Sequence, residues 1–154
     1  MTPVGTGRCV CEAVRYRLDA LPLFTHACHC LTCQKTSGNA FSMTTIIMRE
    51  DLAVTDGEMT ALIPGPGSTV HGCATCRTRI YIESSRFPMT YTLKPGTLDD
   101  TSLATPQAHI WVKRKQRWLI LPTDVPCFDE NYDIGTTWPA DSLTRMAAAM
   151  ARRK

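Results

Sequence analysis

The stretch Cys28-His29-Cys30-Leu31-Thr32-Cys33 places three cysteines within six residues, in the pattern C-x-C-x-x-C. A hydrophobic core uses cysteines singly, as small apolar side chains. A disulfide between cysteines this close would be strained, because bridged Cα atoms lie about 4.4–6.8 Å apart in a restricted geometry. Zinc does bind such clusters, since thiolates are among its preferred ligands. The pattern therefore predicts a metal with three protein thiolates, whose fourth position belongs to another protein group, water or a substrate.

Two further cysteine pairs have the spacing of zinc ligands, Cys9-Val10-Cys11 and Cys73-Ala74-Thr75-Cys76. Together they supply the four-thiolate set of a closed structural zinc site. We therefore expect about two zinc ions per chain, one enclosed by protein ligands and one open. Cys127, the remaining cysteine, lies outside both sets and is expected to be free.

Iron–sulfur ligation or thiol redox chemistry is the alternative for the three-cysteine stretch. Its C-x-C start departs from the usual C-x-x-C-x-x-C iron–sulfur run, which favours zinc. His29 is flanked by two ligands and is expected to point away from the metal. His26 and His71 are close enough in sequence to hydrogen-bond to ligands. His109 is either a core histidine or a residue of a pocket wall.

Length and composition fit an ordinary globular protein. A chain of 154 residues with 44% hydrophobic and 20% charged residues predicts a single domain with a real core. The formal charge of +3 falls to about zero once bound thiolates and zinc ions are included. We therefore expect neither nucleic acid nor a membrane surface as partner, and the sequence gives no indication of oligomeric state.

The first residues lack the apolar segment of a signal peptide, and no apolar run approaches the length of a membrane span. Clustered cysteines without such a segment are typical of cytosolic metal or redox sites. The expected location is therefore the cytoplasm.

Hydrophobic patterns along the chain predict a mainly β fold with a short C-terminal helix. The helix is expected over residues 139–153, where Leu143, Met146, Ala147 and Met150 share one face and Arg152, Arg153 and Lys154 suit the C-terminal end. Loops are expected over residues 35–39 and 63–68, and a basic hairpin tip over 113–117. That tip is either solvated or a binding edge for an acidic ligand. Strands are expected at residues 14–18, 40–48, 52–55, 80–82, 89–93 and 108–112.

Several motifs, taken in order, resemble one known family, the glutathione-dependent formaldehyde-activating enzymes (GFA), which also contains centromere protein V. The resemblance runs from about residue 7 to residue 118, and nothing after about residue 121 contributes to it. The motifs are Gly7-x-Cys9-x-Cys11, Val14-Arg15-Tyr16, Cys28-His29-Cys30-x-x-Cys33-x-Lys35-x-Ser37-Gly38, Cys73-x-x-Cys76, His109-Ile110-Trp111 and Trp118.

The resemblance implies a zinc-stapled fold of several small coiled β-sheets, the Mss-like fold. The chain would be a single GFA-type domain over residues 1–154, with a C-terminal extension from about residue 122. Cys9, Cys11, Cys73 and Cys76 would hold the structural zinc. Cys28, Cys30 and Cys33 would hold the functional zinc.

The family's founding activity is the condensation of glutathione with formaldehyde to S-hydroxymethylglutathione, a carbon–sulfur lyase type of reaction. The resemblance thus implies a zinc enzyme acting on a thiol adduct, with a small-molecule thiol such as glutathione as its partner. Lys35, Ser37, His109 and Trp111 are the candidate substrate contacts. The alternative is a non-catalytic zinc module that binds a protein.

Two positions depart from the family pattern. The family usually has glycine after the second cysteine of each structural pair, where this chain has Glu12 and Arg77. Glycine relieves a left-handed backbone at such a turn, and a side chain there costs about 1 kcal/mol. We therefore expect a left-handed backbone at both residues.

Overall fold

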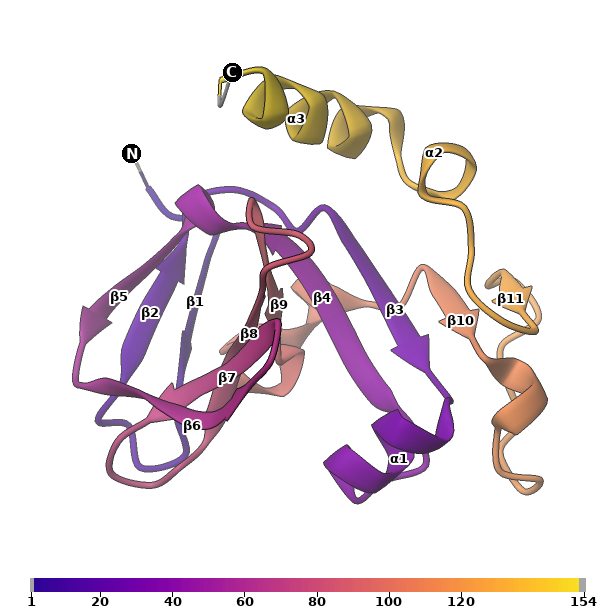
Figure 1. Cartoon of the computed structure of the whole chain (residues 1–154), viewed down its shortest axis with the longest axis horizontal. Coiled ribbons are helices and arrows are strands. Elements are labelled where there is room, and N and C mark those ends of the chain that lie inside the picture. Colours follow the sequence, from indigo (N-terminus) through magenta and orange to yellow (C-terminus); the bar gives the residue numbers. More distant parts are fainter. Residues whose placement is uncertain (1, 153–154) are drawn as a thin grey trace.

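A computed structural model describes residues 2–152, and within this range the chain forms eleven strands in two sheets (Figure 1). The predicted mainly β fold with a short C-terminal helix is confirmed. The helices are α1 (Leu31–Ser37), α2 (Ile134–Thr137) and α3 (Ala140–Ala151), with single 3-10 turns at η1 (Arg49–Asp51), η2 (Pro95–Thr97), η3 (Thr101–Ala104) and η4 (Val112–Arg114).

The smaller sheet has three strands in the order β1-β2-β5, and the larger has eight in the order β11-β10-β3-β4-β9-β8-β7-β6. All pairs are antiparallel except those that β10 makes with β3 and β11. The strands are β1 (Gly5–Arg8), β2 (Arg15–Leu18), β3 (Phe24–Cys28), β4 (Ser42–Met48), β5 (Leu52–Asp56), β6 (Met59–Gly65), β7 (Ser68–Cys73), β8 (Arg79–Ser84), β9 (Thr90–Leu93), β10 (Ala108–Ile110) and β11 (Cys127–Phe128).

One hydrophobic core joins the two sheets. Along β2 the inward residues Tyr16 and Leu18 are buried, while Arg15 and Arg17 are exposed, as the alternating pattern predicts. These inward residues pack against Ile80, Leu93 and other residues of the larger sheet. Cys9 and Cys73 belong to the same core, so it contains one cysteine of each of the pairs Cys9–Cys11 and Cys73–Cys76.

A second core lies under the C-terminal helix. Phe24 of β3 stacks on Trp138 with ring centroids 5.7 Å apart, and Leu143 and Met146 of α3 pack against the same cluster. The predicted helical face is partly wrong, because Ala147 and Met150 are exposed and Ala149 is buried. Arg153 and Lys154, which we expected at the end of this helix, lie outside the described residues.

Ion pairs and hydrogen bonds connect α3 to the loop before β3 and to η1. Arg145 donates to the carbonyl of Leu21 and to Asp51, both at 2.8 Å, and Arg152 pairs with Glu50. Ser142 donates to the carbonyl of Leu23 at 2.6 Å. The segment after residue 121 is therefore packed onto the sheets rather than detached from them.

Three of the expected loops differ from the structure. Residues 63–68 form the tip of the β6–β7 hairpin. Pro64 and Gly65 are accommodated within β6, because the other side of β6 has no strand neighbour in the described sheet. Residues 35–39 instead continue the last turn of α1 into its left-handed cap, Gly38 (φ 66°). Residues 113–117 are not a hairpin tip, because β10 is followed by η4 and pairs in parallel with its neighbours. Among the described helices, none is long and apolar enough to cross a membrane.

Candidate functional site

The four-cysteine cluster, Cys9, Cys11, Cys73 and Cys76, brings together two turns from different sheets. All four sulfur atoms lie within 4.8 Å of one another. Cys9 and Cys11 follow β1, while Cys73 ends β7 and Cys76 lies in the next turn. The backbone N–H groups of Val14 and Cys76 point at the sulfurs of Cys9 and Cys73, at 3.3 and 3.5 Å. Four converging thiols with such donors fit a zinc ion in tetrahedral coordination.

The residue after each pair has the expected left-handed backbone. Glu12 has φ 61° and Arg77 has φ 63°. Their N–H groups donate to the carbonyls of Cys9 and Cys73, at 3.0 and 3.1 Å. Each turn therefore folds back on its first cysteine. Its left-handed residue carries a Cβ and is sterically strained, which glycine would avoid.

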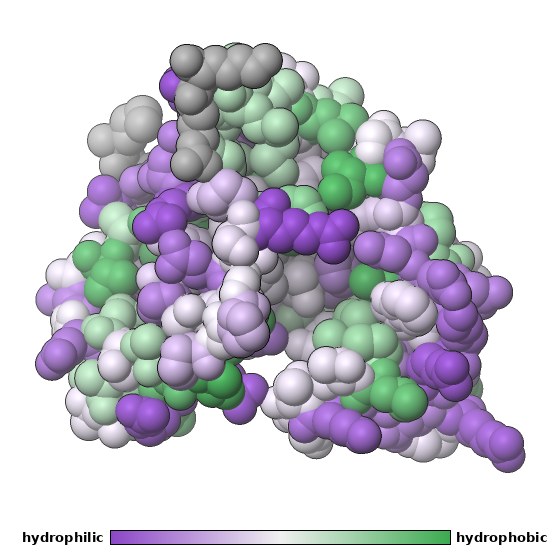
Figure 2. Space-filling model, viewed as in Figure 1, coloured by the Kyte–Doolittle hydropathy of each residue, from purple (hydrophilic) through white to green (hydrophobic). Residues whose placement is uncertain are grey.

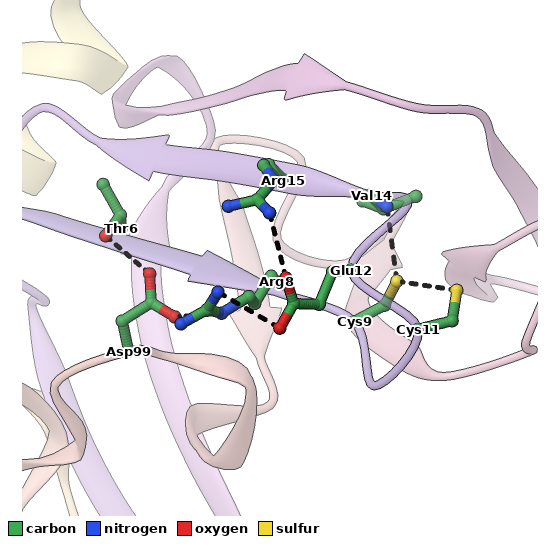
Figure 3. A network of polar contacts seen from close by, with 8 residues as sticks. All are labelled: Thr6, Arg8, Cys9, Cys11, Glu12, Val14, Arg15 and Asp99. Atoms are coloured by element: carbon green, nitrogen blue, oxygen red, sulfur yellow. Dashed lines mark hydrogen bonds and ion pairs between the residues drawn. The ribbon is translucent and has the colours of Figure 1, made fainter.

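The two side chains at these positions differ in their contacts. Glu12 lies between Arg8 and Arg15 and pairs with both, at 3.3 and 3.0 Å, and Arg8 also pairs with Asp99 at 2.8 Å (Figure 3). Arg77 makes no ion pair with any residue that the structure describes. The strain at Glu12 is therefore partly offset by exposed ion pairs, whereas the strain at Arg77 is not.

The three-cysteine cluster, Cys28, Cys30 and Cys33, comes from one continuous segment. Cys28 ends β3, Cys30 is the N-cap of α1, and Cys33 lies in the first turn of that helix. The three sulfurs lie within 4.8 Å of one another, and no other His, Cys, Asp or Glu of residues 2–152 joins the group. The N–H of Cys33 donates to the sulfur of Cys30 at 3.3 Å. This arrangement could hold a metal with one coordination position left open.

His29 and His109 form a buried pair behind this cluster. Nε2 of His29 lies 3.0 Å from Nδ1 of His109, and His29 is fully buried. Burial lowers the pKa of His29 to about 4, helped by the charges of His109 and Lys115, and burial also lowers the pKa of His109. Two neutral rings can share one hydrogen bond, whereas Nδ1 of His29 has no hydrogen-bond partner among the described residues. No ring nitrogen of His29 joins the three clustered sulfurs.

A cavity of about 800 Å³ lies next to the segment that carries the three-cysteine cluster. It is lined by Lys35 and Ser37, which follow Cys33 in α1, and by Ser42, the register partner of Cys28. Three cationic side chains line it, Lys35 from α1, Arg79 from β8 and Lys94 after β9, and we call it the cationic cavity. In the view of Figure 2 the surface is notched between the half that carries β6 and β7 and the half that carries α1. The cavity is therefore suited to an anionic ligand beside the cluster.

Lys94 connects this cavity to the cysteines. Its Nζ donates to Oγ of Ser42 at 3.2 Å, and Ser42 is the register partner of Cys28. Burial lowers the pKa of Lys94, while the charge of Cys33 acts in the opposite direction. Arg79 is fixed by its bond to the carbonyl of Thr36, at 2.8 Å.

The predicted substrate contacts fall into two groups. Lys35 and Ser37 line the cationic cavity, and Ser37 Oγ donates to the carbonyl of Cys33 at 2.7 Å. His109 instead contacts His29, and Trp111 has a left-handed backbone (φ 57°) with the Lys113 ammonium 5.3 Å from its ring centre.

Sequence reasoning missed Arg79 and Lys94. Neither residue belongs to a recognisable motif, and only the pairing of β4, β8 and β9 brings them to the cavity that Lys35 and Ser37 line.

The fold and the clusters define a mainly β domain with two cysteine-rich candidate metal sites. Residues 4–114 match the family model described as glutathione-dependent formaldehyde-activating enzyme, and the chain therefore belongs to this family. Over 83 residues the chain is 31% identical to a Podospora anserina protein named "Putative glutathione-dependent formaldehyde-activating enzyme". That match covers 51% of this chain and 39% of the fungal protein, so the chain spans less than half of its relative.

A solved structure supports the fold. The crystal structure of a Rhodobacter sphaeroides protein superposes with a TM-score of 0.51 at 18% identity. The match covers 79% of this chain and 98% of that one. At this identity the similarity shows a shared fold and nothing about the reaction.

Proposed function

We propose that this protein is a zinc enzyme that adds an anionic thiol such as glutathione to an aldehyde, and also catalyses the reverse carbon–sulfur cleavage. The observation that carries the proposal is the position of the three-cysteine cluster beside the cationic cavity. Family membership supports the same chemistry. Two zinc ions per chain, one at each cysteine cluster, is part of the proposal.

Each part of the site has a role in this proposal. Cys28, Cys30 and Cys33 would hold zinc, which lowers the pKa of a bound thiol and keeps its sulfur as thiolate at neutral pH. Lys35, Arg79 and Lys94 would bind the carboxylates of the thiol through charge-assisted hydrogen bonds. Holding the sulfur beside its electrophile makes the addition effectively unimolecular.

The addition needs no oxidant or reductant. The thiolate sulfur attacks the carbonyl carbon, a C–S bond forms, and the C=O π electrons move to oxygen. The oxygen then takes up a proton, which replaces the one lost by the thiol. The product is a hemithioacetal, and the reverse sequence breaks the same C–S bond.

Cobalt substitution tests the proposal, because Co²⁺ absorption reports its ligands. Titration of the cobalt protein with glutathione is expected to add a sulfur-to-cobalt band. Cys30→Ser should abolish the band, and Cys127→Ser, which alters a cysteine outside both clusters, should retain it. An unchanged spectrum at millimolar glutathione would rule out glutathione as a metal ligand and favour a protein-binding zinc module.

A further inference from the structure

A second cavity lies on the same face of the larger sheet, under the C-terminal segment. Its volume is about 240 Å³, and no Lys, Arg, Asp or Glu lines it, so we call it the uncharged cavity. The sheet contributes side chains such as His26, Thr44 and Thr92. The C-terminal segment contributes Tyr132 and Trp138, among others. That segment lies beyond residues 4–114, which match the family.

Two residues that line the uncharged cavity, His26 and Ile110, are neighbours of Cys28 in the larger sheet. His26 and Cys28 are two residues apart on β3, so their side chains share one face and their Cα atoms are about 7 Å apart. Ile110, which lines the cavity, is the register partner of Cys28 on β10. In Figure 1, β3 and β4 run from the C-terminal helices at one end to α1 at the other.

The two cavities also meet each other. Ile82 of β8 lines both. Along β4, Ser42 lines the cationic cavity and Thr44 lines the uncharged one. Near the end of β9, Lys94 lines the cationic cavity and Thr92 lines the uncharged one. Since alternate residues of a strand share a face, both cavities lie on the face of β3 and β4 that carries Cys28.

The wall formed by the C-terminal segment is held in a fixed position. The indole Nε1 of Trp138 can only donate, so the Tyr132 hydroxyl accepts from it at 3.2 Å. The Tyr132 hydroxyl is then free to donate to Nδ1 of His26, 3.0 Å away. This chain of hydrogen bonds ties the segment to β3, and it leaves a preformed space rather than a collapsed one.

We propose that the uncharged cavity binds the hydrocarbon group of a neutral aryl or medium-chain alkyl aldehyde, with its carbonyl directed toward Cys28, Cys30 and Cys33. Anionic thiol and neutral aldehyde would then approach the cluster from opposite cavities. A dry cavity of about 150 Å³ in another protein holds benzene, so the uncharged cavity has room for a ring with a substituent. Formaldehyde has no hydrocarbon group to fill it. This inference rests on the proposed thiol addition and assigns its electrophile.

Binding can be measured without turnover, with benzyl alcohol as an unreactive probe. We expect a saturable shift of the Trp138 indole ¹⁵N–H signal in the zinc-loaded protein. Met150 lies on a neighbouring groove and does not line the uncharged cavity, so its methyl signal should not move. Thr92→Leu fills the cavity and should weaken binding about tenfold, roughly 1.4 kcal/mol. Thr92→Val keeps the volume and should bind as the parent protein does.

Thr69→Leu makes the same change on β7, at a position that neither cavity includes, and serves as the stability control. If Thr92→Leu does not fold, Thr44→Leu closes the same space from β4. Equal binding by the parent and a folded, cavity-filled variant, or no shift of Trp138, would overturn the inference.

Kinetics separate this inference from the function on which it rests. With glutathione, benzaldehyde is expected to react with a higher kcat/KM than formaldehyde, and Thr92→Leu should raise KM for benzaldehyde alone. Binding of the probe without turnover of any aldehyde would overturn the thiol addition. Turnover of formaldehyde but not benzaldehyde would leave the addition standing and overturn the assignment of the uncharged cavity.

Discussion

The two cysteine clusters differ in the parts of the chain that they bring together. In the four-cysteine cluster, Cys11 and Cys73 lie 62 residues apart in sequence, yet their sulfurs are 3.9 Å apart. It joins a turn of the smaller sheet to a turn of the larger one. The three-cysteine cluster forms within one segment, where a strand ends and a helix begins.

We interpret the four-cysteine cluster as the one that stabilises the fold and the three-cysteine cluster as the one that carries the chemistry. A cluster that crosses sheets can form only when the fold forms, so the binding energy of a metal held there would contribute directly to folding. A cluster within one segment crosslinks little of the chain, and its metal can be exposed to a ligand. The register partners of Cys28, Ser42 and Ile110, line the cationic and the uncharged cavity, as this interpretation requires.

The largest contrast is expected between Cys76→Ser and Cys30→Ser. Removing a ligand that joins the sheets should lower the free energy of unfolding by at least about 3 kcal/mol, roughly 6–12 °C in Tm. Cys30→Ser should change Tm little, because serine is a favoured N-cap and can still accept from the N–H of Cys33. Thermal melts of the zinc-loaded variants test this. A larger loss of Tm in Cys30→Ser would reverse the assignment of structural and functional clusters.

Metal removal should distinguish the clusters in a similar order. Elemental analysis is expected to give about two zinc ions per chain. A chelator should remove the ion of the three-cysteine cluster first, because only three protein ligands hold it. Cys127→Ser should retain both ions, since Cys127 is exposed and in neither cluster. Iron with visible charge-transfer absorption, or one ion fewer in that variant, would contradict these ligand sets.

A smaller effect should follow from Lys94→Gln. Loss of a cation beside the three-cysteine cluster is expected to weaken glutathione binding about tenfold, which is roughly 1.4 kcal/mol. Zinc content should stay the same at both clusters, and calorimetric titration provides the measurement. Lys113→Gln is the matched control, because Lys113 pairs with Glu130 and does not line the cationic cavity. Equal losses in the two variants would remove the cationic cavity as the thiol site.

Cysteine spacing predicted both clusters, because the three-cysteine segment and each of the two cysteine pairs have a short spacing typical of metal ligands, and two pairs complete a set of four. Hydrophobic patterns located six of the eleven described strands, and Tyr16 and Leu18 are buried as their alternation predicts. They missed β1, β3, β6, β7 and β11. Registers between distant strands are not encoded locally. The sequence therefore did not indicate that Lys94 belongs to the candidate site, although the pairing of β4 with β9 brings it to Ser42.

The uncharged cavity also could not be predicted from the sequence. It exists because Trp138 and Tyr132 of the C-terminal segment pack onto β3, about a hundred residues earlier in the chain. The helix 140–151 was predictable from its pattern, but its buried face was rotated from the expected one by tertiary contacts such as Ser142 with Leu23.

The smallest expected effect is a gain of stability at the four-cysteine cluster. Arg77→Gly should relieve a left-handed backbone strain of about 1–2 kcal/mol. The greater freedom of glycine in the unfolded chain offsets about 0.4–1 kcal/mol of this gain in the free energy of unfolding. Arg77→Ala keeps Cβ and should give no gain, so it separates the backbone from the lost side chain. Glu12→Gly should gain less than Arg77→Gly, because two exposed ion pairs of about 0–1 kcal/mol each are lost with it. Denaturant unfolding of the zinc-loaded proteins measures all three. If Arg77→Gly is less stable than Arg77→Ala, the turn does not store the strain that its φ of 63° indicates, and the arginine has a role at this cluster beyond its backbone.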